Sequence, residues 1–185
     1  MTEEQIRRSI EQNRLQLNGW LKFDHYCVVW SILFIPAIFL YFHLKDYWQG
    51  KPAPFNKFEM GFIAVTLFLA GVFYYIQHKR LRFKSVKTRL RREQLDSVIE
   101  KVAEELKWIP ERIDDKVIIA KTHPGFFSGS WGEHITILFD GNRVLVNSIC
   151  DPEKRCSVLA MGRNKRNERR LLEAIEKPGK RYVRS

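Results

Sequence analysis

The chain has 185 residues, with 32 Lys and Arg against 21 Asp and Glu, and its formal net charge is +11. This length allows one or two domains, and three cysteines are too few for a disulfide-stapled secreted scaffold. Seven of the cations and six of the acids precede residue 78, so almost all of the excess positive charge lies in residues 78–185.

Residues 1–24 are predicted to contain an amphipathic helix over 2–22. Thr2 and Gln5 fit a capping box at its start, and apolar side chains recur at helical spacing, at Ile6, Ile10, Leu17 and Leu21. The helix either lies on the inner leaflet, with its cations toward anionic headgroups, or packs on the C-terminal domain. The sequence leaves both interpretations open.

Residues 25–77 are predicted to form a transmembrane helical hairpin with spans at about 26–44 and 59–77. The first run holds 19 residues without Asp, Glu, Lys or Arg, and residues 60–76 add 17 more. About 20 apolar residues in a helix cross the hydrocarbon core of a bilayer. A chain of this length has too little other protein to bury two uncharged helices on all sides. Membrane lipid is therefore an expected partner.

The positive charge beside the second span predicts the orientation of the hairpin. Residues 78–92 form a basic juxtamembrane segment with eight Lys and Arg and no acid, whereas residues 45–57 hold only three Lys. By the positive-inside rule, both termini are expected to be cytoplasmic. The basic segment either serves only to set this topology or also binds anionic lipid headgroups, with its first cations the candidates: Lys79, Arg80, Arg82 and Lys84.

The second span carries a stripe of small residues, Gly61, Ala64 and Gly71, on one helical face. Such a stripe lets another helix approach closely. The neighbour is expected to be the first span or a second copy of the chain. Neither span places an ionisable group deep in the membrane, which argues against a proton or ion pathway built by this chain alone.

Residues 93–185 are predicted to form a cytoplasmic α+β domain with the element order α-β-β-β-α. The run Asp140-Gly141-Asn142 is a hairpin turn signal between two of the strands. An antiparallel sheet with both helices on one face is the natural arrangement of these elements, and we expect the domain to fold alone from about residue 90. Apolar periodicity gives the expected elements: a helix over 95–109, strands at 116–121, 134–140 and 143–149, and a helix over 163–177.

A glycine-rich stretch at 124–132 places three aromatic side chains, Phe126, Phe127 and Trp131, in a loop. The glycines match neither the P-loop nor the dinucleotide-binding pattern. The aromatic side chains either fold over the edge of the sheet or contact a partner or the membrane.

No catalytic residue, metal site or cofactor is predicted. Cys150 and Cys156 lack the spacing of a zinc site and are expected to be inert thiols. A membrane-tethered hydrolase remains an alternative only because the chain contains residue types that hydrolases use. None of these candidate residues stands in a nucleophile-elbow motif. These candidates are His123, His134, Ser128, Ser130 and Asp151.

The last predicted helix opens with a cluster of cations. A helix N-terminus favours anions, so cations there indicate an anionic partner such as a phosphate, a headgroup or an acidic protein surface. The other interpretation is a solvated helix face balanced by nearby Glu residues. Aromatic side chains do not alternate with these cations, which argues against nucleic acid. The predicted partner-binding residues are Arg163, Lys165, Arg166, Arg169 and Arg170.

The second half of the chain carries three further runs: WGEHITI at 131–137, VNSICDP at 146–152 and GRNKRN at 162–167. These runs resemble the C-terminal domain of uncharacterised bacterial inner-membrane proteins that have two transmembrane helices. The resemblance implies the bacterial inner membrane and a split between anchor and domain, and it implies no activity. The expected function is that of a membrane-anchored accessory or docking protein that presents a basic domain to an anionic protein or to lipid. The alternatives are the tethered hydrolase and a homo-oligomeric membrane assembly.

Overall fold

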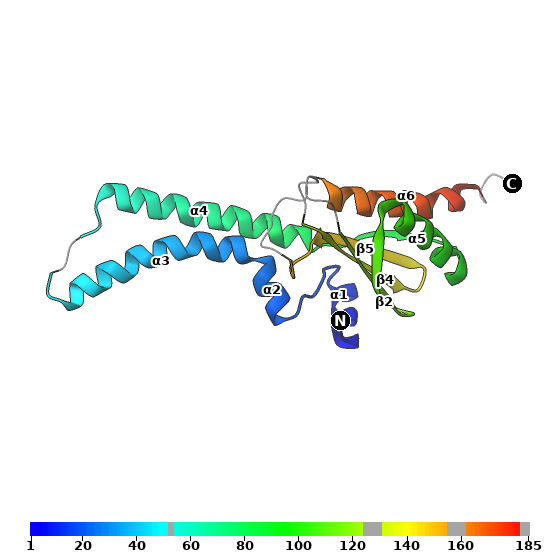
Figure 1. Ribbon diagram of the computed structural model, residues 1–185, viewed down its shortest axis with the longest axis horizontal. Helices are drawn as coiled ribbons and strands as arrows, with labels where there is room; N and C mark the ends of the chain where they lie inside the picture. The colour runs from blue at the N-terminus through cyan, green and yellow to red at the C-terminus, as the bar shows by residue number, and fades with distance from the viewer. Residues whose placement is uncertain (52–53, 124–130, 155–161, 182–185) are drawn as a thin grey trace.

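The computed structural model describes residues 1–51, 54–123, 131–154 and 162–181. It has a long helical hairpin that projects from a domain of mixed helix and sheet (Figure 1). The elements are, in chain order, α1 (Glu3–Glu11), α2 (Gly19–His25), α3 (Cys27–Trp48), α4 (Lys57–Arg80), β1 (Lys84–Lys87), α5 (Arg92–Leu106), β2 (Trp108–Ile113), β3 (Val117–Thr122), β4 (Glu133–Asp140), β5 (Arg143–Cys150) and α6 (Arg163–Arg181).

The sheet has five antiparallel strands in the order β1-β5-β4-β3-β2, so the antiparallel sheet expected from the sequence is confirmed. The hairpin between β4 and β5 turns through Gly141 and Asn142, with Asp140 paired to Arg143. Gly141 has a φ of +57°, the left-handed conformation that a two-residue turn of this kind requires and that glycine adopts without strain.

The predicted order α-β-β-β-α misses both outer strands. β1 lies within 78–92, which was expected to be only a basic juxtamembrane segment, and it pairs with β5. β2 begins where the helix was expected to continue, because α5 ends at Leu106 and Lys107 turns the chain with a φ of +56°. Pro110 lies in β2, whose register with β3 shifts beside it. An edge strand tolerates a proline because one side of it needs no partner.

One face of the sheet is covered by α5 and α6, as Figure 1 shows. The alternating apolar residues of three central strands point to this side and form one buried cluster with the apolar stripes of both helices. This burial agrees with the predicted helix periodicities. The cluster includes Ile118, Ile135, Ile137, Val144 and Val146 from the sheet and Leu95, Ile99, Val102, Leu171 and Ile175 from the helices.

The two helices of the domain lie on one face of the sheet, as expected, and the opposite face is covered by the N-terminal segment. Ile6 of α1 and Leu15 pack with Val117, Ile119 and Leu138 in a second buried cluster. The capping box of Thr2 and Gln5 is confirmed. The single helix expected over 2–22 is instead two helices, because residues 12–18 between α1 and α2 form no helix. The sequence left open whether this segment lies on the inner leaflet or packs on the C-terminal domain, and α1 packs on the domain.

The helices α3 and α4 pack side by side along one line of contact, which we call the seam. The least exposed residues of α3 recur at helical spacing along one side, and those of α4 do the same. Most other apolar side chains point outward, for example Trp48, Phe58 and Phe68. The seam is formed by Val29, Ile32, Pro36, Phe39 and His43 from α3 and by Ile63, Thr66, Ala70, Phe73 and Gln77 from α4.

Both α3 and α4 are long and apolar enough to cross a membrane, and only 6% and 11% of their apolar windows are buried. A core helix of a soluble protein would be largely covered by other protein. These two helices therefore suggest membrane association.

The hairpin is joined to the domain by backbone pairing as well as by chain connectivity. The N–H of Leu15 donates to the carbonyl of Leu81 at 2.8 Å, and the N–H of Phe83 donates to the carbonyl of Asn13 at 3.2 Å. The buried side chain of Asn147 donates to the carbonyls of Arg80 at 2.8 Å and of Arg82 at 3.1 Å. The end of α4 is thus fixed both to the N-terminal segment and to the sheet.

Candidate anion-binding cleft

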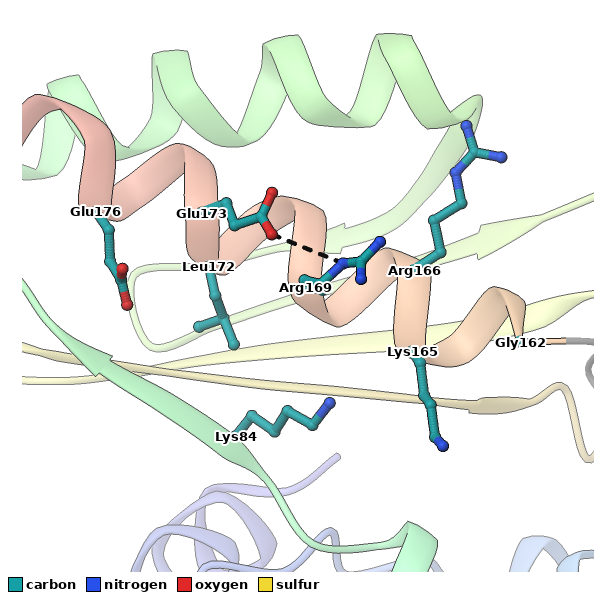
Figure 2. Close-up of a pocket in the computed structure, with 8 residues that line it drawn as sticks. All are labelled: Lys84, Gly162, Lys165, Arg166, Arg169, Leu172, Glu173 and Glu176. Atoms are coloured by element: carbon teal, nitrogen blue, oxygen red, sulfur yellow. Dashed lines mark ion pairs between the residues drawn. The ribbon is translucent and has the colours of Figure 1, made fainter.

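A cleft of about 660 Å³ lies where the last turn of α4, strand β1 and the first turn of α6 meet. We call it the junction cleft. An adjoining hollow of about 480 Å³ shares Lys84, Gly162 and Lys165 with it and extends along α6 to Arg166 and Arg169. Figure 2 shows Lys84 of β1 and Lys165 of α6 on the same side of α6, whereas Arg166 extends away from them. Residues about 80 positions apart in the sequence therefore form one basic surface.

The charge of the junction cleft is strongly unbalanced. Within the part of the chain that the structure describes, five cations line it and Glu168 is the one acid. Among the described residues, no ion pair involves Lys79, Arg82 or Lys165. A concave surface with an excess of one charge raises the local concentration of oppositely charged groups. The five cations are Lys79, Arg80, Arg82, Lys84 and Lys165.

Glu168 sets the position of Lys84. Its carboxylate is buried, with one oxygen accepting the backbone N–H of Ser148 at 3.2 Å and the other lying 2.7 Å from the Lys84 ammonium. A buried carboxylate needs such partners because it has lost its hydration. The Lys84 side chain is therefore held at the wall of the cleft, although about half of it remains exposed to solvent.

A chain of polar contacts supports the first turns of α6 beside the cleft. The indole N–H of Trp108 donates to Asn167 at 3.4 Å, and the amide of Asn167 donates to the Ser148 hydroxyl at 3.1 Å. The same hydroxyl lies 3.1 Å from the side-chain amide of Asn164. Because these groups are buried or half-buried, their contacts give the start of α6 one defined position against β5.

The predicted anion-binding residues separate into three groups. Lys79, Arg80, Arg82 and Lys84, predicted as headgroup ligands, all line the junction cleft together with Lys165. Arg166 and Arg169 line the adjoining hollow, where Arg169 lies 3.6 Å from a carboxylate oxygen of Glu173.

Two of the predicted cations point elsewhere. The Nε of Arg163 lies 2.8 Å from a carboxylate oxygen of Glu133, which is fully buried and also bonded to Thr122. Arg170 pairs with Glu105, with 2.8 Å between the Arg170 Nε and a carboxylate oxygen. Both arginines hold the fold together and do not line the cleft.

The sequence reasoning missed the acid and the amide that organise this region. Glu168 was interpreted as a charge that balances a solvated face, and Asn147 was noted only within a run of residues. The signal available for Glu168 was its helical spacing, because it stands three and four positions before Leu171 and Leu172 of the apolar stripe.

The other predicted sites are only partly described. Trp131 is 46% exposed, and Phe126, Phe127 and Cys156 lie outside the described residues. Cys150 is half-buried and forms no disulfide bond. Cys27 in the first turn of α3 is disulfide-bonded, a bond that the cysteine spacing did not predict. No group of His, Cys, Asp and Glu able to hold a metal ion is found in the part of the chain that the structure describes.

The residues of the hydrolase alternative are not assembled within the described ranges. Burial lowers the pKa of His134, and the carboxylate of Asp151 partly offsets this effect. His123 instead contacts Lys154, with 3.2 Å between the ring Nδ1 and the ammonium. Ser128 and Ser130 lie outside the described residues. Within the described ranges, half-buried His134 and buried Asp151 therefore form an electrostatic pair, and His123 lies apart from it.

A buried lysine lies close to this pair. The ammonium of Lys121 is 2.8 Å from Glu111 and 2.6 Å from Glu153. Burial lowers the pKa of Lys121, but the hydrogen bonds to the two carboxylates outweigh this and raise its pKa above the ordinary value. The group is thus a neutralised ion cluster that ties β2, β3 and the turn after β5 together.

The small residues of the α4 stripe are exposed and do not face α3. A side chain added at Gly61 or Gly71 would meet no other atom within 4 Å, and Ala64 is exposed. The residues of α4 that face α3 are the seam residues given above. The expectation that the small-residue stripe packs on the first span is therefore wrong.

Comparisons with protein-family models, curated proteins and solved structures found no match for this chain.

Proposed function

We propose that this chain is an integral membrane protein of the bacterial inner membrane, in which the α3–α4 hairpin anchors a basic cytoplasmic domain. The domain acts as a docking or accessory module and binds an anionic partner, a protein surface or lipid, at the junction cleft. The outward-facing apolar side chains of both helices support the anchor. The basic residues after α4 support a cytoplasmic position for both termini.

The observation that carries the proposal is the place of the cleft directly after the apolar part of α4. Tyr75 and Ile76 line it from the helix, and Lys79 and Arg80 follow within about one turn. If α4 spans the bilayer, these cations lie at the level of the inner headgroups. The binding surface then faces both the membrane and the cytoplasm. The geometry supplies binding groups, so the proposal assigns no reaction.

The test uses the full chain, because the structure argues against the expectation that residues from about 90 onward fold alone. Such a fragment lacks β1 and the N-terminal segment that covers one sheet face. The protein is placed in nanodiscs of zwitterionic lipid and titrated with a fluorescent oligoglutamate peptide at 50 and 500 mM NaCl. We expect binding at low salt that is largely lost at high salt, because salt screens exposed charges. Absent or salt-insensitive binding would contradict the proposal.

A homo-oligomeric membrane assembly is the second candidate. The open face of Gly61, Ala64 and Gly71 favours it, because small residues allow close helix contacts in lipid. Gly71→Leu should convert an oligomer to a monomer in detergent sizing, whereas Val72→Leu, at the neighbouring position, should not. A monomeric wild-type chain would remove this candidate.

A further inference from the structure

The lining of the junction cleft combines apolar and cationic side chains. Tyr75, Ile76 and Phe83 supply apolar surface, and Arg82 and Lys165 are among its cations. A small inorganic anion would use only the cationic part. A ligand with an anionic group attached to an apolar body would use both. The cleft volume of about 660 Å³ lies within the range of about 300–1,000 Å³ typical of small-molecule sites.

Along α4, the cleft residues change from apolar to cationic in the same order as the layers of a bilayer, from acyl chains to headgroups. Tyr75 and Ile76 belong to the last apolar turn of α4, and Lys79 lies about 6 Å further along the helix axis from Tyr75. In a membrane-spanning α4, the apolar wall would face the acyl region and the cations would face the headgroups. With α4 placed in this way, the α4 cations of the cleft lie at the depth of the lipid phosphates.

The cations come from two parts of the molecule. Lys79 and Arg80 belong to the anchor, whereas Lys84 and Lys165 belong to the domain. Lys84 is held in place by buried Glu168, so at least one donor is positioned before a ligand arrives. Preorganised groups lose less entropy on binding. A phosphate held here would touch both anchor and domain.

The start of α6 also favours an anion in the cleft. Gly162, directly before α6, and Asn164, in its first turn, line the cleft. The positive end of the helix dipole favours an anion there, and it disfavours Lys165 unless an anion is present. The charge arrangement of the first turn therefore fits a cleft that is occupied by a negative group.

We propose that the junction cleft binds the phosphate group of one anionic phospholipid of the inner leaflet, with the glycerol and upper acyl portion against Tyr75 and Ile76. This inference rests on the proposed membrane anchoring and specifies its anionic ligand. The bound lipid bridges the hairpin and the sheet domain, so it fixes the height of the domain at the membrane surface.

The test is native mass spectrometry of the full chain in a neutral detergent. The chain is titrated separately with dioleoylphosphatidylglycerol, dioleoylphosphatidylcholine and inorganic phosphate. We expect the anionic lipid to bind more tightly than the zwitterionic one. Each cation near an anionic lipid surface contributes about fivefold, so the double variant Arg82→Gln/Lys165→Gln should weaken binding of the anionic lipid roughly 30-fold. Both side chains are exposed, and the variant should unfold at the wild-type temperature.

A matched control removes the same charge elsewhere. Arg89 and Lys101 are exposed and do not line the cleft. The double variant Arg89→Gln/Lys101→Gln should change binding of the anionic lipid less than about threefold, since it only lowers the long-range attraction.

Three results would overturn the lipid site. Equal losses in the two double variants would indicate diffuse attraction by the basic segment. Equal affinity for the two lipids would show that the phosphate charge is not recognised. Displacement of the lipid by millimolar inorganic phosphate would make the free anion the ligand. If the lipid site fails while the chain still binds oligoglutamate in nanodiscs, the proposed docking function stands and only this inference falls.

Discussion

Truncation of Ile6 tests whether α1 is a structural part of the sheet domain. Ile6 is 4% exposed and packs with Val117, Ile119 and Leu138 on the sheet. Ile6→Ala removes three carbon groups, each contributing about 0.8 kcal/mol when buried, and it leaves a cavity between helix and sheet. The sum predicts a loss of about 3 kcal/mol in the free energy of unfolding.

The loss is measured by urea unfolding of the full chain in a mild detergent, followed by circular dichroism. With an m-value of about 2 kcal/mol/M, the midpoint should fall by about 1.5 M. Ile113→Ala is the matched control, because Ile113 is 65% exposed on the edge strand β2 and should cost less than about 1 kcal/mol. An Ile6→Ala midpoint equal to that of the wild type would show that α1 does not pack on the sheet.

Three further predictions concern groups around the sheet. Burial lowers the pKa of His134, so in acid the folded chain binds fewer protons than the unfolded chain. The free energy of unfolding is therefore highest above about pH 6.5, and as the pH is lowered from there it decreases by at most about 1.4 kcal/mol per pH unit. His134→Gln should reduce this slope in urea unfolding at pH 5.5 and 7.5, and an unchanged slope would refute the assignment. Asn147→Ala removes two hydrogen bonds to the end of α4 and should cost about 2 kcal/mol, with faster trypsin cleavage near residue 80; unchanged cleavage would show that the joint does not depend on it. Arg163→Gln removes the guanidinium that lies 2.8 Å from buried Glu133 and should cost about 2 kcal/mol, after allowing for the partial exposure of the arginine, with no loss of oligoglutamate binding; a loss of binding at wild-type stability would return Arg163 to the anion site.

The central part of the domain followed from the sequence because its signals are local. Alternation of apolar residues placed β4 and β5, and the Asp140-Gly141-Asn142 turn joined them in the observed register. The helix periodicities of α5 and α6 also held, because one apolar stripe per helix faces one side of the sheet.

The edges of the domain did not follow, because they depend on partners far apart in the sequence. The sequence of β1 is typical of a basic segment that sets membrane topology. Only one of its residues, Val86, is buried, so it shows no strand-like apolar alternation. β2 begins after Lys107 adopts a left-handed conformation, which a lysine does not signal in a sequence. The N-terminal helix was ambiguous because an apolar stripe fits a membrane surface and a sheet equally well.

The candidate site was predicted in two halves. The cations after the second span and those at the start of the last helix were each recognised as candidates for anions. Their meeting in one cleft was not, because the pairing of β1 with β5 brings Lys84 beside α6. The exclusion of Arg163 from this cleft likewise required the tertiary position of Glu133, which is fully buried.

Protease protection tests the central claim most directly, namely that the hairpin spans lipid and leaves the basic cleft on the inner side. Trypsin is added to intact cells and to inverted membrane vesicles that contain the full chain with an epitope at its carboxyl end. We expect the epitope to survive in intact cells and to be removed in inverted vesicles, with the chain retained by carbonate-washed membranes. Loss of the epitope from intact cells would contradict the account and place the domain, with the disulfide-bonded Cys27 at its base, on the oxidising outer side.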